Sequence, residues 1–512
     1  MSLNRLKKTK NTIRNIISGF LSKGVSLVLP FLVRTIVLRR FGTEYLGLNS
    51  VFYSVISVLN LAELGFSASV VYSLYKPVAE NDTDTVCAYL AYFRIIYRNI
   101  GLFVGIAGVL MMPFLPFLVK DTVVPGNLNL YIWYLIILSD PVLSYLVKGY
   151  KTVIPTAVQR NDILSVISIV TVIVKSTLQI IVLYLGRTFY AYLLVLPLSP
   201  LIHNLFLSYQ VEKQFPEYVP RGMITDEQKK QLRPILAGLL IHKVRAISRN
   251  GFDSICLSAF IGLAAAGIYE NYLYVMTMVI SMASIITSSM LSGIGNSIVT
   301  DSKEKNYQDM CKFDFMYMTL AGWASICMLC LYQPFMKLWA GEVNMLGLPE
   351  VIGFVLYFYV LCVGNIRWLY LEGAGLWWES RYVAIAESVG NLVLNILLVR
   401  WLGVLGIILG TLISLIIADN IFGARIVFDH YFQNGKLSEY FRNQLTYLLV
   451  STVIAIPVYL FSTVIPSETV IMFVVKGIIC AFLPIGLYYL IYRRFPQFQE
   501  TKMWIKQHLK HS

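Results

Sequence analysis

GLFVGIAGVLMMPFLPFLV, residues 101–119, contains no charged side chain. The hydrocarbon core of a bilayer is about 30 Å thick, and a helix needs about 20 predominantly apolar residues to cross it. Similar apolar runs recur along the 512 residues, of which 57% are hydrophobic and 14% are charged. The mean hydropathy is +0.67. This composition is too apolar for a soluble domain and indicates a membrane protein with many spans.

The apolar runs predict about fourteen transmembrane helices. They are too long for the strands of porin-like barrels, which alternate over about ten residues. The predicted fold class is therefore an all-α polytopic membrane protein. The first run is too long for a cleavable signal peptide, so we expect it to remain as a span. The predicted spans cover residues 13–38, 46–74, 87–119, 129–150, 162–186, 189–209, 233–258, 266–297, 312–339, 350–372, 381–401, 403–428, 442–464 and 469–492.

The distribution of the +14 net charge predicts the topology in the membrane. Lys and Arg concentrate in residues 1–14, in the longest predicted loop (210–232) and in residues 493–512, whereas the predicted outer loops are short and carry few. Cytoplasmic segments of membrane proteins are enriched in Lys and Arg, so we expect both termini in the cytoplasm. Arg39 and Arg40 run against this pattern in the first outer loop. The placement of the charge argues against nucleic-acid binding.

The chain contains a weak internal repeat. A shift of 220 residues places Phe41-Gly42 over Ile261-Gly262 and Gly47 over Gly267. Parallel repeats are an architecture of transporters, in which the substrate site lies at the interface between the repeats. We therefore predict two parallel six-helix halves joined by the loop at 210–232, with two further helices and a basic tail. The predicted divisions are residues 1–215, 216–431 and 432–512.

Motifs of several enzyme classes are missing from the sequence. There is no G-x-x-x-x-G-K-[ST] run to cradle a nucleotide phosphate, and no H-E-x-x-H or paired Cys/His set to propose a catalytic metal. Cys327 and Cys330 match C-x-x-C, but they lie in an apolar run without the context of a redox motif. We expect no cofactor, no metal and no enzyme activity.

Ionisable residues within the predicted spans are the candidate functional residues. Each costs about 2.5–3.5 kcal/mol at a helix centre on insertion scales, so it is expected to face a cavity or a partner. The densest group lies in LLIHKVRAISRNGFDS, residues 239–254. Positively charged side chains outnumber negatively charged ones among these embedded residues, and the planar guanidinium of Arg fits phosphate. We therefore predict a cationic cavity that receives an anionic substrate group, lined by Arg34, Arg94, Arg98, Lys175, Lys243, Arg245, Arg249 and Arg367.

Some of these residues also have a structural interpretation. Arg94, Arg98 and Arg367 lie toward the predicted cytoplasmic ends of their helices, from which long side chains reach the headgroups. Asp253 follows Arg249 by one turn and would neutralise it. Glu387 and Asp419 are interpreted as pairing with a neighbouring basic group. Ion coupling or pairing remains open for Glu63, Asp253 and Glu270.

One region resembles a known family. Residues 33–85, VRTIVLRRFGTEYLGLNSVFYSVISVLNLAELGFSASVVYSLYKPVAENDTDT, contain an arginine near the end of the first span, F-G, E-Y-L-G-L, A-E-L-G-F-S and a polar A-E-N-D exit. This run resembles the first two helices of polysaccharide-export flippases, the Wzx-type and capsule or teichoic-acid flippases of the multidrug/oligosaccharidyl-lipid/polysaccharide exporter superfamily. The predicted number of spans and the paired halves also fit that superfamily.

The resemblance implies an alternating-access carrier in the bacterial cytoplasmic membrane. Its expected substrate is an undecaprenyl-diphosphate-linked oligosaccharide, moved from the inner to the outer leaflet for capsule, O-antigen or teichoic-acid synthesis. Membrane lipids, a polysaccharide polymerase and export machinery are the expected partners.

Arg34 matches the cavity arginine of helix 1 in the superfamily's lipid II flippases. Residues 57–61 hold no counterpart of the helix 2 arginine of those flippases, which argues against lipid II as the substrate. The alternatives are a membrane-embedded polysaccharide polymerase or glycosyltransferase, and a cation-exporting multidrug carrier of the same superfamily.

Overall fold

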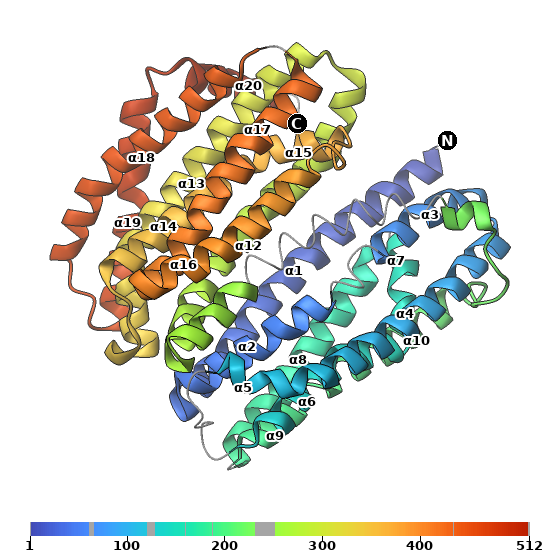
Figure 1. Ribbon diagram of the computed structural model, residues 1–512. Helices are drawn as coiled ribbons and strands as arrows, with labels where there is room; N and C mark the ends of the chain where they lie inside the picture. Colours follow the sequence, from blue (N-terminus) through green and yellow to red (C-terminus); the bar gives the residue numbers. More distant parts are fainter. Residues whose placement is uncertain are drawn as a thin grey trace. The chain divides into compact units, whose positions relative to one another are not determined.

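The computed structural model describes residues 2–60, 66–119, 128–158, 160–186, 188–230, 251–433 and 435–509 (Figure 1). Within these residues every regular element is helical. The chain divides into two compact units, Met1–Gly267 and Ile268–Ser512. The predicted division into six-helix halves at residues 215 and 431 remains a prediction.

The described residues of the first unit form long helices and several short helical segments. Its last described helical segment before α12 is Gly251–Phe260. The helices are α1 (Ser2–Phe41), α2 (Thr43–Leu59), α3 (Phe66–Glu80), α4 (Thr83–Met111), η2 (Met112–Phe114), α5 (Leu115–Leu118), α6 (Leu130–Leu146), η4 (Gly149–Thr152), α7 (Val153–Ala157), α8 (Asn161–Leu185), α9 (Phe189–Leu194) and α10 (Leu198–Gln214).

The second unit is also helical and contains two π-helical stretches. Its first helix, α12, begins with five residues that belong to the first unit. The elements are α12 (Leu263–Thr300), α13 (Lys303–Ala340), η5 (Glu342–Asn344), α14 (Leu348–Cys362), α15 (Asn365–Gly373), α16 (Arg381–Ser414), the π-helix η6 (Leu415–Phe422), α17 (Gly423–Val427), the π-helix η7 (Phe428–Phe432), α18 (Leu437–Val464), α19 (Val470–Tyr492) and α20 (Pro496–Leu509).

The described helices confirm the predicted class of an all-α polytopic membrane protein. Ten of them are long and apolar enough to cross a membrane, and an eleventh is obtained when α6 and the bent segment Gly149–Ala157 are taken as one span. The predicted spans 381–401 and 403–428 lie in one continuous helical stretch that kinks at Gly403, whose φ is +58°. Only residues 251–258 of the predicted span 233–258 are described.

Polar caps set the starts of several spans. Asp82 accepts from the Thr85 N–H at 3.0 Å before α4, and Asn129 accepts from two N–H groups in the first turn of α6. Ser302 and Thr469 cap α13 and α19 in the same way. A side-chain oxygen at this position satisfies an N–H group that the helix leaves unpaired. These residues therefore fix where the polar loops end and the apolar helices begin.

The first unit is held by long helix pairs and an aromatic core. α1 packs along α8, α4 packs along α6, and α10 contacts both α6 and α8. Buried Trp133 on α6 donates to Asn49 on α2 at 2.8 Å and stacks edge-on against Phe52. Gly47 lets the start of α2 approach the first turn of α12, where the backbone of Gly267 lies against it. This close approach joins two glycines that the sequence repeat predicts to be equivalent.

In the second unit α13 is the central helix and packs against α14, α18 and α19. Trp323 on α13 donates to the Ala481 carbonyl of α19 at 2.7 Å, and Tyr488 on α19 donates to Ser451 of α18 at 2.7 Å. Large apolar side chains on the outer faces of α18 and α19 are exposed, among them Val453, Ile478 and Phe482. Such faces are expected for helices surrounded by lipid.

Candidate functional site

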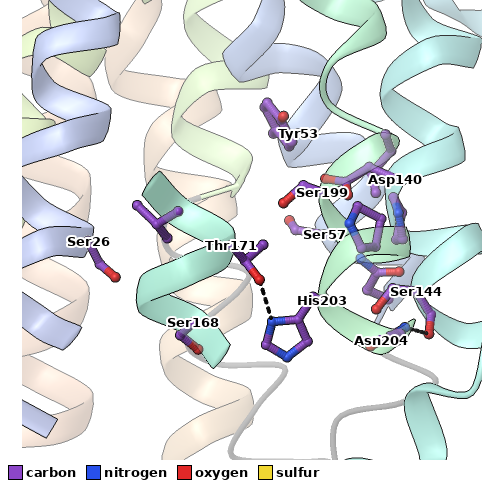
Figure 2. Close-up of a pocket in the computed structure, with 15 residues that line it drawn as sticks. Ser26, Tyr53, Ser57, Asp140, Ser144, Ser168, Thr171, Ser199, His203 and Asn204 are labelled. Carbon is purple, nitrogen blue, oxygen red and sulfur yellow. Dashed lines mark hydrogen bonds between the residues drawn. The ribbon is translucent and has the colours of Figure 1, made fainter. Parts of the chain in front are cut away.

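A polar cavity of about 630 Å³ lies inside the first unit. Five helices, α1, α2, α6, α8 and α10, contribute to it (Figure 2). Nine of the fifteen described lining residues carry a hydroxyl or amide group, one carries a carboxylate and one an imidazole. The polar lining residues are Ser26, Tyr53, Ser57, Asn60, Asp140, Ser144, Ser168, Thr171, Ser199, His203 and Asn204.

Hydrogen bonds orient part of this lining. In Figure 2, Thr171 of α8 and His203 of α10 face one another, and their Oγ1 and Nδ1 atoms are 3.4 Å apart. Asn204 donates to the Ser144 carbonyl at 2.8 Å, which links α10 to α6. Ser57 bonds within its own helix, to the Ser54 carbonyl. The cavity thus presents several donors and acceptors between otherwise apolar helices.

Two of the predicted cations lie close to this cavity. Lys175 of α8 is half-buried and interacts electrostatically with Asp140. Asp140 in turn interacts with Tyr53, which also interacts with Tyr192. Tyr192 lies within electrostatic range of Arg34 near the end of α1. Arg34 and Lys175 thus lie within electrostatic range of Tyr192 and Asp140, respectively, although neither is among the described residues that line the cavity.

Two other predicted cations, Arg94 and Arg98, line a second cavity of about 750 Å³ in the first unit. We call it the basic cavity. It lies between α4, the end of α6 with η4, the end of α10 and the loop that follows α10. Lys148, Lys151 and Glu212 complete its charged lining. The structure thus separates Arg94 and Arg98 from the polar cavity.

Arg367 lies in the core of the second unit and is 1% exposed. Its Nη2 atom donates to the Asp419 carbonyl at 3.0 Å and lies 3.7 Å from the Asp419 carboxylate. Gly364 leaves room for the guanidinium, since a Cβ there would lie 2.6 Å from Nη2. Asp314 and Tyr440 also interact electrostatically with it. This environment favours the structural interpretation of Arg367, as a link between α15, η6, α13 and α18.

The remaining predicted residues are only partly described. Asp253 is 1% exposed in the segment Gly251–Phe260, whose Ser254 bonds to Ser50 of α2 at 3.0 Å. Glu270 on α12 is half-buried. Four predicted residues lie outside the described ranges: Glu63, Lys243, Arg245 and Arg249. Among the described residues, no group of three or more His, Cys, Asp or Glu is placed to hold a metal ion.

Asp140 and Lys151 line the two cavities but are not among the residues predicted from the sequence. Asp140 lies within the predicted span 129–150, so the criterion that selected the other embedded charges would have selected it too. Lys151 follows the left-handed residue Lys148, after which the chain bends by 62° and carries Lys151 into the protein, where it is 5% exposed. Nothing in the apolar pattern predicts that bend.

Comparisons with known proteins agree with this architecture. A family model described as "Polysaccharide biosynthesis protein" matches residues 12–292. The lipid II flippase MurJ in an inward closed conformation is similar with a TM-score of 0.66 at 14% identity, over 94% of this chain and 99% of that one. An inward-facing multidrug resistance MATE family transporter of the MOP superfamily is similar with a TM-score of 0.60 at 15% identity, over 77% and 92%. A mutant of the Vibrio cholerae MATE transporter VcmN gives 0.58 at 15% identity, over 85% and 99%. No protein with a curated description matches the sequence.

Proposed function

The chain belongs to the polysaccharide biosynthesis protein family, and from this premise we propose that it is a flippase for lipid-linked oligosaccharides. It moves undecaprenyl-diphosphate-linked repeat units from the inner to the outer leaflet of the bacterial cytoplasmic membrane by alternating access. The repeat units serve the synthesis of a cell-surface polysaccharide such as capsule, O-antigen or teichoic acid. The observation that carries the proposal is the polar cavity among membrane-spanning helices. The fold shared with a flippase supports it.

The polar cavity suits the sugar part of such a substrate. Its hydroxyl and amide groups offer both donors and acceptors, which match the hydroxyls of an oligosaccharide. Its volume of about 630 Å³ lies within the roughly 300–1,000 Å³ of small-molecule sites. The prenyl chain is apolar and remains in the bilayer while the sugars cross. We therefore assign Asn60, Thr171 and His203 to sugar contacts.

We assign the diphosphate to the embedded cations. Arg34 and Lys175 lie near the polar cavity and interact with its surroundings. Arg245, Arg249 and Lys243 join them in the proposal on the strength of their sequence pattern. Arg fits phosphate oxygens through two parallel N–H bonds, and a low-dielectric site strengthens this attraction.

The energy source involves the membrane potential and embedded carboxylates. Moving a negative charge outward from a negative interior is favoured by about 2.3 kcal/mol per charge per 100 mV. We assign ion coupling to Glu63, Asp253 and Glu270 as candidates. A polysaccharide polymerase and export machinery would use the substrate after it reaches the outer leaflet. No bond is made or broken in the proposed cycle, so the protein is not an enzyme.

One observation favours the cation-exporting alternative. Among the described residues that line it, the polar cavity contains Asp140 and His203 but no Lys or Arg. A carboxylate in a polar cavity attracts an organic cation, so the Asp140→Asn variant separates the two functions. It should abolish uptake of an organic cation into vesicles if the protein is a cation exporter. If the protein is the proposed flippase, the variant should largely keep glycolipid translocation, because asparagine removes the charge but still offers hydrogen bonds to a sugar.

Depletion of the protein in its host tests the proposed function. The flippase proposal expects lipid-linked repeat units to accumulate and to be accessible to a lectin only after the cytoplasmic membrane is permeabilised. The polymerase alternative expects unpolymerised repeat units that the lectin reaches without permeabilisation. Unchanged levels and location of the repeat units would contradict both functions. Restoring the wild-type chain provides the control.

A further inference from the structure

We propose that the basic cavity binds the phosphate group of a membrane lipid in the inner leaflet, at a site separate from the polar cavity. This inference goes beyond the proposed function, because binding at this site does not require translocation. It rests on the charge of the cavity, on its depth in the membrane and on the apolar surface beside it.

The basic cavity has an excess of positive charge. Among the described residues that line it there are four cations and one carboxylate, so the net charge of this part of the lining is +3. Glu212 is shared, because it pairs with buried Lys151 and lies 3.4 Å from the Nζ atom of Lys148. Ser208 also accepts from Lys151 at 2.9 Å. Within the described residues, no carboxylate pairs with Arg94 or Arg98 in an ion pair. These two guanidinium groups therefore carry the attraction for an anion.

The position of these arginines on α4 matches the depth of lipid phosphates. Residues 100–119, which follow them, contain no charged side chain. Twenty residues at 1.5 Å each give about 30 Å, the thickness of the hydrocarbon core. Arg98 thus lies at one edge of the core. The positive-inside pattern predicts that this edge faces the cytoplasm.

The apolar wall of the cavity continues as a lipid-facing stripe. Ile95 and Leu146 line the cavity and are exposed. Further along α4, the side chains of Leu102, Ile106 and Val109 are also exposed. Residues 95, 98, 102, 106 and 109 follow the three- and four-residue spacing of one helix face. Arg98 therefore shares its face with side chains that contact acyl chains. A ligand with a phosphate head and an apolar tail fits this combination.

Specific contacts fix the opposite wall of the cavity. The loop after α10 is bonded to the start of α4, where the Cys87 thiol donates to the Glu217 carbonyl at 3.4 Å. The Arg221 N–H donates to the Cys87 carbonyl at 3.3 Å, and the Arg221 side chain pairs with Asp84 at 2.8 Å. Phe215 and Tyr218 of this loop stack on one another with ring centroids 6.2 Å apart. A fixed wall distinguishes this site from arginines that only extend to scattered headgroups.

Native mass spectrometry of the purified full-length chain tests the proposal. Phosphatidylglycerol, phosphatidylcholine and undecaprenyl phosphate are titrated separately. We expect the Arg94→Gln/Arg98→Gln variant to bind at least ten-fold more weakly to phosphatidylglycerol or to undecaprenyl phosphate. The lipid with the larger loss identifies the source of the phosphate, and phosphatidylcholine, whose phosphate is balanced by choline, should bind more weakly to the wild type. The matched control is Arg493→Gln/Arg494→Gln, which removes two exposed arginines at the end of α19.

A second variant keeps Arg94 and Arg98 and reduces the volume of the basic cavity. Ala91 lines the cavity, so Ala91→Trp should fill part of it and weaken lipid binding as well. The proposal is overturned if Arg94→Gln/Arg98→Gln and Ala91→Trp bind both anionic lipids as tightly as the wild type. It is also overturned if the Arg493→Gln/Arg494→Gln control loses as much affinity as Arg94→Gln/Arg98→Gln. Because lipid binding is measured without transport, failure here leaves the flippase proposal untouched.

Discussion

Replacing Gly47 by alanine should destabilise the first unit at the crossing of α2 and the start of α12. A Cβ at position 47 would overlap the Leu263 carbonyl oxygen and would lie 3.0 Å from both the Gly267 nitrogen and the Leu263 carbonyl carbon. Ordinary contacts of a carbon atom begin at about 3.2–3.5 Å, so the two backbones must separate by about 1 Å or more to relieve the overlap with the carbonyl oxygen. Both neighbours are backbone atoms, which cannot rotate away as a side chain would.

The expected loss follows from two opposing effects. Overpacking costs about 1–3 kcal/mol, while the better helix propensity of alanine returns up to about 1 kcal/mol. We expect a net loss of about 1–2 kcal/mol. At about 2–4 °C per kcal/mol for a unit of this size, the unfolding temperature should fall by about 2–8 °C.

Thermal unfolding of the detergent-solubilised protein, followed by size-exclusion chromatography, measures this change. The matched control is Gly390→Ala in α16, where a Cβ would meet nothing within 4 Å. Gly267→Ala should cost a similar amount, because its Cβ would overlap the Thr43 carbonyl oxygen. The double variant should cost less than the sum, since one separation of the backbones accommodates both methyl groups. If Gly47→Ala unfolds at the same temperature as Gly390→Ala, the close approach of the two backbones does not exist.

Three further changes test other parts of the structure. Arg367→Met should cost about 3–5 kcal/mol because it removes the buried guanidinium that pairs with Asp419. Arg367→Met/Asp419→Asn should recover part of that loss in the same unfolding assay, and equal stability of the two variants would contradict the pairing. Gly403→Ala should cost about 1–3 kcal/mol of stability, because the backbone conformation at Gly403 (φ +58°, ψ −132°) is unfavourable for any residue with a Cβ. If this variant unfolds at the same temperature as Gly390→Ala, α16 does not kink at residue 403. Thr171→Val should leave the unfolding temperature within about 2 °C of the wild type and lower glycolipid translocation several-fold, because it removes a hydroxyl from the polar cavity. Thr446→Val, which removes a half-buried hydroxyl on α18, should have no effect, and equal transport by the two variants would exclude a sugar contact at Thr171.

The sequence pattern predicts the long helices well because each span is a continuous apolar run. Helices α8 (Asn161–Leu185) and α19 (Val470–Tyr492) agree with the predicted spans 162–186 and 469–492 within one residue at each end. The predicted break at residue 402 coincides with the kink at Gly403. A glycine between two apolar runs is therefore a useful signal, because only glycine adopts that backbone conformation easily.

Bends and burial are harder to predict. The predicted span 129–150 ends early, since α6 stops at Leu146 and the chain turns at Lys148, whose φ is +56°. A lysine in the left-handed region depends on tertiary contacts, which no local pattern reports. A charged side chain within a predicted span likewise identifies a candidate functional residue, but the sequence does not show to which site it belongs. Arg94 and Arg98 lie in the basic cavity and Arg367 lies in a buried pair, although all three look alike in sequence.

Movement of a lipid-linked oligosaccharide across the bilayer is the activity that we propose for the protein. The most direct measurement is the leaflet distribution of prenyl-diphosphate-linked oligosaccharide in sealed vesicles, detected with a membrane-impermeant lectin and compared with protein-free vesicles under the same membrane potential. We expect rapid equilibration with the wild type and slow equilibration with the folded Arg245→Ala/Arg249→Ala variant. Equal rates in wild-type and protein-free vesicles, with a matched sugar and an ion gradient, would contradict the proposed activity.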